Sequence, residues 1–233
     1  MDVTEEVVVR LRTVFEPEAD AEWAVGAAAY MRNQFPFLGL RTPTRRRLAK
    51  QALADLPPPT EAQLAAATRL LWEQSEREFQ YAGCDLLAEH VSVAGPGFID
   101  VARELVVTRS WWDTVDALAT HTVGPLVRRH SELASVMDDW IRSENMWVAR
   151  TALLHQLTYR ADTDADRLFA YCRTRAGDPE FFIRKAIGWA LRTYAAHEPE
   201  RVASFLLDTP SLSPLSVREA TKGVERTRRR RGP

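Results

Sequence analysis

The residues best suited to chemistry lie in one run, SWWDTVD at residues 110–116. Ser110 is suited to capping a helix and Asp113 is a favourable acid in the first turn, so both have structural explanations. Asp116 has no such local explanation. It follows Trp112 by four residues, which places the two side chains on one face of a helix. The carboxylate is therefore either paired with a cation or held for catalysis.

One carboxylate among indoles suits the hydrolysis of an N-glycosidic bond. The transition state of that reaction resembles an oxocarbenium ion, which an ionised Asp116 would stabilise while orienting or deprotonating a water. Indole faces attract cations by about 0.5–2 kcal/mol each. An alkylated purine already carries positive charge and leaves without a general acid, so one carboxylate suffices. The same pattern is also typical of a core tryptophan beside a salt-bridged aspartate, with Arg150 or Lys185 as the cation.

The elements that must position these residues are predicted to be helices. Glycine is sparse, at 10 of 233 residues, and apolar residues recur at helical spacing between short Pro- or Gly-containing connections. Expected helices cover residues 20–31, 42–56, 60–73, 76–91, 97–107, 111–122, 131–142, 145–158, 163–174, 179–195, 199–207 and 214–226. We predict one all-α domain over residues 1–226 and a disordered basic tail over residues 227–233.

A repeat is present within this pattern. Four helices begin with an aromatic residue at spacings of 33, 35 and 35, namely Phe79, Trp112, Trp147 and Phe182. Two helices in such a period are typical of an α-solenoid, in which equivalent helices share one surface. Trp189 lies seven residues after the last of these aromatics, on the same expected surface. The alternative is that the aligned aromatics are simply core residues.

Composition and charge limit the classes of function. The longest apolar run is nine residues, which is too short to cross a bilayer. The two cysteines and five histidines show no metal-ligand spacing, so no metal is expected. The acidic start of the chain does not resemble a signal peptide, which favours a cytoplasmic protein. The net charge of −1 does not favour nucleic acid, but residues 1–24 carry seven acids against two bases and residues 215–233 carry seven bases against two acids.

Basic residues supply a candidate binding surface for DNA phosphates. They form a cluster near residues 41–50, a pair at residues 128–129, and a group in the later repeats. The candidates are Arg41, Arg45, Arg46, Arg47, Lys50, Arg128, Arg129, Arg150, Arg184, Lys185 and Arg192. Some of them must be ordinary surface arginines, because adjacent residues such as Arg46 and Arg47 cannot share one helix face.

Several segments together resemble the AlkD family of alkylpurine DNA glycosylases, over residues 30–222. They are YMRNQFPFLGL at residues 30–40 with Thr42-Pro43 and Arg45-Arg46 after it, REFQY at residues 77–81, the run at residues 110–116, WVARTALLHQL at residues 147–157, and FFIRKAIGW at residues 181–189 with Leu191-Arg192. The resemblance implies a solenoid of HEAT-like repeats with a basic concave face that grips duplex DNA, and hydrolytic release of N3- or N7-alkylated purines.

The resemblance also assigns roles to residues. Trp112 and Trp189 are expected to wall the sugar of the lesion, and Asp116 to stabilise the oxocarbenium ion and position water. Arg150 is expected to contact the DNA backbone near the lesion. We therefore predict a monofunctional glycosylase of base excision repair that acts as a monomer without metal or organic cofactor. This hypothesis requires that neither Trp112 nor Trp189 be buried.

Other residues are expected on the DNA side, namely Tyr30, Arg41, Arg45, Lys185 and Arg192. Arg41 is a departure, because a polar amide is expected before Thr42-Pro43, and lesion preference is open for that reason. Two alternatives remain. A non-catalytic HEAT-like module would bind damaged or branched DNA through the same basic surface, and a protein-binding scaffold would be the commonest use of an α-solenoid.

Overall fold

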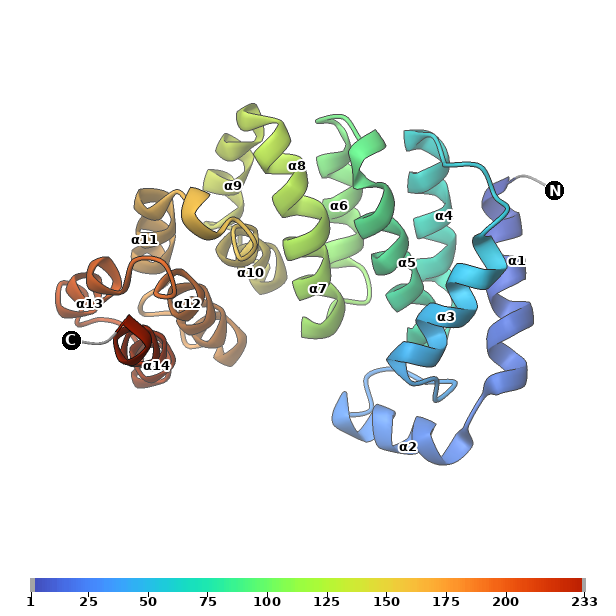
Figure 1. Cartoon of the computed structure of the whole chain (residues 1–233), viewed down its shortest axis with the longest axis horizontal. Helices are drawn as coiled ribbons and strands as arrows, with labels where there is room; N and C mark the ends of the chain where they lie inside the picture. The colour runs from blue at the N-terminus through green and yellow to red at the C-terminus, as the bar shows by residue number, and fades with distance from the viewer. Residues whose placement is uncertain (1–2, 232–233) are drawn as a thin grey trace. The chain divides into compact units, whose positions relative to one another are not determined.

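The computed structural model describes residues 3–231, and all regular structure within that range is helical (Figure 1). The prediction of an all-α chain is confirmed. Contacts divide the chain into two compact units, Met1–Arg109 and Ser110–Pro233, which are described separately below. The expectation of a single domain over residues 1–226 stays a prediction. Within the described range, none of the helices combines the length and apolarity that crossing a membrane demands.

The first unit contains six α-helices, coloured blue to green in Figure 1. Their bounds are α1 (Val3–Phe15), α2 (Ala21–Tyr30), α3 (Thr42–Leu53), α4 (Glu61–Glu73), α5 (Arg77–His90) and α6 (Phe98–Val107). Helices α1, α3, α4 and α5 surround a core that includes Val7, Leu11, Phe15, Leu71 and Phe79. The helices expected over residues 20–107 are therefore present, with ends that differ by a few residues.

Helix α1 was not among the expected helices. Its sequence contains three consecutive valines, which lower helix propensity because a branched Cβ restricts χ1. The side chains of Val7, Leu11 and Phe15 recur at every fourth residue and are at most 6% exposed. Packing of this apolar stripe against the rest of the unit therefore outweighs the local preference.

The loop before α3 is held by one buried carboxylate. Glu78 on α5 accepts hydrogen bonds from the backbone N–H groups of Leu38, Gly39 and Leu40 at 3.0, 2.8 and 3.1 Å. Gly39 has φ +91°, and a Cβ added there would lie 2.0 Å from the carbonyl oxygen of Asp20. Only glycine fits this position. Residues 30–40, one of the segments that resemble the AlkD family, therefore include a loop whose conformation depends on this glycine.

The second unit contains the remaining helices, coloured yellow-green to red in Figure 1. Their bounds are α7 (Trp112–Leu118), α8 (Gly124–Arg129), α9 (Ala134–Trp140), α10 (Met146–Leu154), α11 (Ala165–Thr174), α12 (Phe181–Tyr194), α13 (Pro199–Leu207) and α14 (Pro214–Arg231). Helix α14 includes residues 227–231 of the tail that was expected to be disordered. Residues 232–233 lie outside the described range.

Helices α7 and α8 are joined without a break by a π-helical segment, Ala119–Val123. Pro125 lies two residues after this segment, and a proline lacks the N–H that a regular α-helix would need at that position. The wider π turn, which often occurs near functional sites, accommodates this interruption. The segment begins three residues after Asp116, whose carbonyl oxygen accepts a hydrogen bond from Thr120 Oγ1 at 2.7 Å.

The aromatic repeat seen in the sequence corresponds to helix starts. Phe79, Trp112, Trp147 and Phe182 each lie within the first three residues of α5, α7, α10 and α12. In the second unit, contacts connect α7 to α10, α10 to α12, and α12 to α14. The repeat therefore brings one helix from each period into contact with the next.

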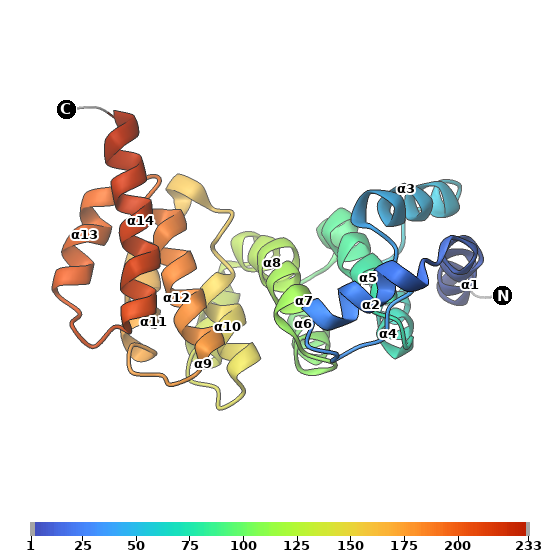
Figure 2. The same cartoon turned by 90° about the horizontal axis from the view of Figure 1, so that it is seen from below.

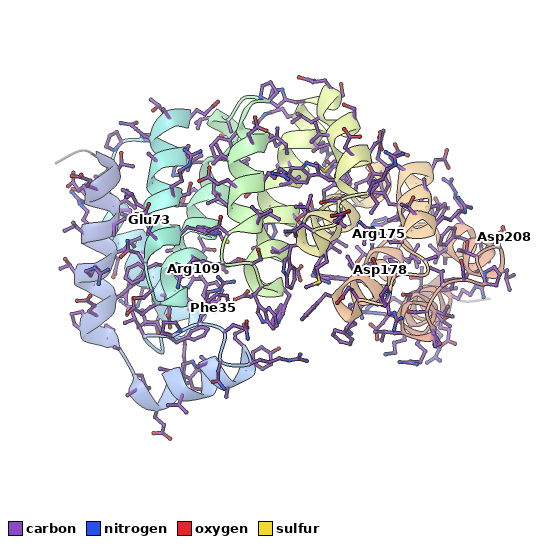
Figure 3. All side chains as sticks on the ribbon, turned by 180° about the vertical axis from the view of Figure 1, so that it is seen from behind. Phe35, Glu73, Arg109, Arg175, Asp178 and Asp208 are labelled. Atoms are coloured by element: carbon purple, nitrogen blue, oxygen red, sulfur yellow. The ribbon has the colours of Figure 1, made fainter. Side chains whose placement is uncertain are left out.

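Arg175 ties the end of α9 to the loop before α12. Its Nε donates to the carbonyl oxygen of Ile141 at 2.7 Å, and its Nη2 donates to the carbonyl oxygen of Ser143. Its Nη1 lies 3.2 Å from the carboxylate of Asp178, and Figure 3 shows these two labelled side chains close together. Carbonyls just beyond the last turn of a helix are thus satisfied by a side chain from the next repeat.

His155 makes the stability of the second unit depend on pH. It is 2% exposed, its Nδ1–H donates to the carbonyl oxygen of Ala152, and burial lowers its pKa to about 4. Because the unfolded chain takes up this proton near pH 6.5, native stability is lost as the pH falls from about 6.5 to about 4, by roughly 3 kcal/mol. Denaturant unfolding of the wild type and of His155→Gln between pH 7 and 5 checks this. The variant should show the shallower pH dependence, and equal slopes would contradict the assignment.

Candidate active site

Asp116 lies one turn into α7. Trp111 has an extended backbone, with φ −155° and ψ 160°, so the helix begins at Trp112. The side chain of Asp116 is 13% exposed, and Trp112 is partly exposed. The helix therefore carries a nearly buried carboxylate one turn from an indole that solvent can reach.

Arg150 on α10 is the cation that pairs with Asp116. Its Nε and Nη2 donate to the two carboxylate oxygens at 2.7 and 2.8 Å, and its Nη1 donates to the carbonyl oxygen of Phe182 on α12. The guanidinium side chain is 5% exposed. A two-pronged pair of this kind fixes the plane of the carboxylate, so α7, α10 and α12 together set its orientation. The sequence offered Arg150 or Lys185 for this role, and the structure selects Arg150.

The protonation of Asp116 reflects two opposing effects. Burial raises its pKa, the hydrogen bonds and positive charge of Arg150 lower it, and the nearby charge of Asp113 raises it; the net result is a pKa above that of an ordinary aspartate. A carboxylate that has lost most of its water but keeps its charge interacts strongly with a developing cation.

Three aromatic rings pack beside this ion pair. Trp111, Trp147 and Phe182 have ring centroids 5.1 to 5.8 Å apart. The indole Nε1 of Trp111 is buried without an acceptor among the described residues, a cost that the aromatic packing must offset. The aligned aromatics of α10 and α12 therefore contact each other, with Trp147 buried and Phe182 partly exposed, and the partly exposed Trp111 joins them in the α7 repeat.

Trp189 lies two turns after Phe182 along α12. Lys185, Trp189 and Arg192 follow one another at intervals of four and three residues, which places them on one face of the helix. All three side chains are partly exposed. Trp112 and Trp189 thus both meet the requirement that neither indole be buried.

Comparison with known families identifies the family of this chain. The sequence matches the family described as DNA alkylation repair enzyme over residues 11–224, which is nearly the whole chain. This chain belongs to that family. A role in DNA repair follows from the membership.

A solved structure supports the same assignment. The chain superposes on a predicted DNA alkylation repair enzyme from Enterococcus faecalis with a TM-score of 0.82 and 32% sequence identity, over 88% of this chain and 95% of the other. The search of curated proteins gives no match. The α-solenoid class of HEAT-like helical repeats, predicted from the sequence, is confirmed for this chain.

Three residues expected to contact DNA lie in the first unit. Tyr30 is 71% exposed at the end of α2. Arg41 is exposed, and its guanidinium stacks 4.2 Å from the ring centroid of Trp23. Arg45 is 4% exposed, lies 2.8 Å from the carboxylate of Asp85, and has its pKa lowered by burial. Tyr30 and Arg41 are accessible to a phosphate and Arg45 is not accessible in this conformation, but the three DNA contacts stay predictions.

The sequence reasoning missed one part of the site, the role of Trp111. The run at residues 110–116 includes it, but the repeat spacing drew attention to Trp112. The useful signal would have been an aromatic residue directly before a helix, where the extended backbone of Trp111 lets its ring contact Trp147 and Phe182 of the following repeats. Among the described residues, no group of three or more His, Cys, Asp or Glu side chains could hold a metal ion.

Proposed function

We propose that this chain is a monofunctional DNA glycosylase that hydrolyses the N-glycosidic bond of N3- or N7-alkylated purines in duplex DNA. One observation carries the proposal. Asp116 is a nearly buried carboxylate held in a fixed plane by Arg150, one turn from the partly exposed indole of Trp112. Such a group is suited to stabilising positive charge that develops on a sugar.

The proposed reaction is a hydrolysis that needs no cofactor. The C1′–N bond breaks and its electron pair leaves with the base, whose alkyl group has already made it cationic. Water adds to C1′, and its proton passes to Asp116 or to solvent. The products are the free alkylated base and an abasic sugar. Asp116 must be ionised, so we expect the rate to fall as the pH drops through its raised pKa.

The two partly exposed tryptophans complete the proposed site. Trp112 on α7 and Trp189 on α12 present indole faces, which attract a cationic sugar by about 0.5–2 kcal/mol each. We propose that they line the sugar of the lesion. Arg150 orients Asp116 in this proposal, and its predicted contact with the DNA backbone requires one of its donors to be shared with a phosphate.

The test is release of 7-methylguanine from duplex DNA by the purified full-length chain. We expect the base to appear faster than it does spontaneously in buffer, with an abasic site left in the strand. No release above the spontaneous rate, from protein shown to be folded by circular dichroism, would overturn the proposal.

A second candidate function is a non-catalytic module that binds damaged or branched DNA. The observation that favours it is that both oxygens of Asp116 already accept hydrogen bonds from Arg150. In this candidate the carboxylate only stabilises the fold. It predicts binding to the alkylated duplex without release of the base, so the same experiment separates the two functions.

A further inference from the structure

A group of cations surrounds one carboxylate where α12 and α14 meet. The side chain of Glu219 on α14 is 11% exposed. Its Oε1 accepts a hydrogen bond from Lys222 at 2.9 Å, and its Oε2 accepts one from Arg192 on α12. The hydrogen bond from Lys222 lowers the pKa of Glu219, as do the charges of Lys185 and Arg192. Two cations therefore pair with one carboxylate and the charge of Lys185 also acts on it, so the group keeps excess positive charge.

Two glycines set the positions of these cations. A Cβ added to Gly188 on α12 would lie 2.8 Å from the Cβ of Glu219, and a Cβ added to Gly223 on α14 would lie 2.6 Å from the carbonyl oxygen of Arg192. The two helices thus meet with almost no side chain between them at these points, and Figure 1 shows them side by side. Close backbone packing fixes the alignment of α14 on α12, and with it the place of Lys222 beside Arg192.

The positive charge continues along the exposed face of α14. Arg218, Lys222 and Arg226 follow at intervals of four residues, and none of the three is buried, whereas Ala220, Val224 and Thr227 are buried. Within residues 3–231, neither Arg218 nor Arg226 has an ion-pair partner. Figure 2 shows the last turns of α14 extending past the ends of α12 and α13. A row of cations is therefore open to solvent along several turns of one helix.

We propose that this α14 seam, formed by Lys185, Arg192, Arg218, Lys222 and Arg226, binds phosphates of the DNA backbone next to the nucleotide held at Trp189. Trp189 lies between Lys185 and Arg192 on the same face of α12. The proposal rests on the proposed function, which places the sugar of the lesion at Trp189. Glu219 does not repel the backbone, because both of its oxygens are occupied by cations.

The regular spacing of the cations on this surface favours DNA as the partner. Arginine and lysine side chains one helical turn apart match a polymer that carries a negative charge at regular intervals, and neutralising each phosphate releases counterions. The net charge of the whole chain is −1, so attraction to DNA must come from such local surfaces.

The first test is the salt dependence of binding to an unmodified duplex. In the double variant Lys222→Gln/Arg226→Gln, we expect weaker binding and a plot of log K against log[salt] that is shallower by about 1.8, or about 0.9 for each lost phosphate contact. The control is Arg201→Gln/Arg228→Gln. It removes two exposed arginines of the same unit, namely Arg201, which pairs with Asp166, and Arg228, which lies on α14 but pairs with Glu200 on α13. The control should keep the wild-type slope, and equal slopes for the two double variants would overturn the proposal.

The second test measures the protection of individual lysines in the wild-type chain, so the net charge of the protein is not altered by substitution. The side chain of Lys222 is 65% exposed, so an amine-acetylating reagent should modify it readily in the free protein. We expect a saturating unmodified duplex to slow acetylation of Lys222 and Lys185, measured by mass spectrometry. Unchanged acetylation of Lys222 at saturation would overturn the proposal.

The outcome of these two tests does not depend on the outcome of the glycosylase test. They measure binding to DNA that contains no lesion, so they require no release of base. Absence of 7-methylguanine release would overturn the glycosylase while leaving a protected Lys222, and equal salt slopes would overturn the α14 seam while leaving an active glycosylase.

Discussion

Replacing Asp116 by asparagine is expected to lower the rate of 7-methylguanine release by about 100-fold or more, because the carboxylate that stabilises the oxocarbenium ion and accepts a proton from water is removed. The amide still fits beside Arg150 and accepts one of its hydrogen bonds. Affinity for unmodified DNA should therefore remain. Single-turnover release of the base and a separate binding titration check both statements.

A matched control for this variant lies on the same helix. Asp113→Asn removes one negative charge from the first turn of α7, and the charge of Asp113 affects the pKa of Asp116 less than burial and Arg150 do. For that reason this control should keep the rate within about 3-fold. Full activity in Asp116→Asn would show that the proposed chemistry is wrong, even if the chain releases alkylated bases.

The second large effect is expected for Arg150→Met, which removes the charge of the side chain and keeps much of its volume. Asp116 is then left nearly buried without its cation, and the carbonyl oxygen of Phe182 loses its donor. Removing one partner of a buried pair costs about 3–5 kcal/mol. Denaturant unfolding at pH 7 measures the loss. A loss in the free energy of unfolding below about 1 kcal/mol would contradict a stabilising role for the Asp116–Arg150 pair.

The same variant has a characteristic pH dependence. Both effects of Arg150 lower the pKa of Asp116, so in Arg150→Met that pKa rises further. The acid side of the rate profile should move to higher pH. The loss of stability relative to the wild type should be full above the new pKa of Asp116. It should shrink as the pH falls from that value to the wild-type pKa, because in this range the carboxyl takes up its proton in the folded variant but not in the folded wild type. A wild-type rate profile in this variant would contradict the electrostatic coupling.

A double variant tests whether Asp116 and Arg150 affect stability and activity as a pair. In Asp116→Asn/Arg150→Met neither charge remains. The double variant should therefore lose much less stability than the sum of the losses in the two single variants. The double variant should nevertheless be as slow as Asp116→Asn in releasing base. Additive stability losses would show that the two side chains act independently, which the two hydrogen bonds of 2.7 and 2.8 Å argue against.

Local periodicity and the aromatic repeat determine much of this protein by themselves. The apolar spacing predicted nearly all the helices after residue 20, and the 33- to 35-residue aromatic repeat predicted the helices that meet in the second unit. The spacing of Trp112 and Asp116 predicted a shared face, and the choice of Arg150 or Lys185 as partner included the correct one. These features follow from the geometry of a helix, which sequence spacing describes directly.

Tertiary structure alone decided which of the candidate side chains are accessible. Arg45 is buried against Asp85, although its neighbour Arg46 is exposed. Arg150 is held by Asp116 and the carbonyl of Phe182, while Lys185 stays on the face of α12 near Glu219. Burial of a charged group depends on helices that come together from positions more than 30 residues apart. The sequence therefore identified the carboxylate and its possible partners, and only the packing of α7, α10 and α12 decided that Arg150 is the cation that holds it.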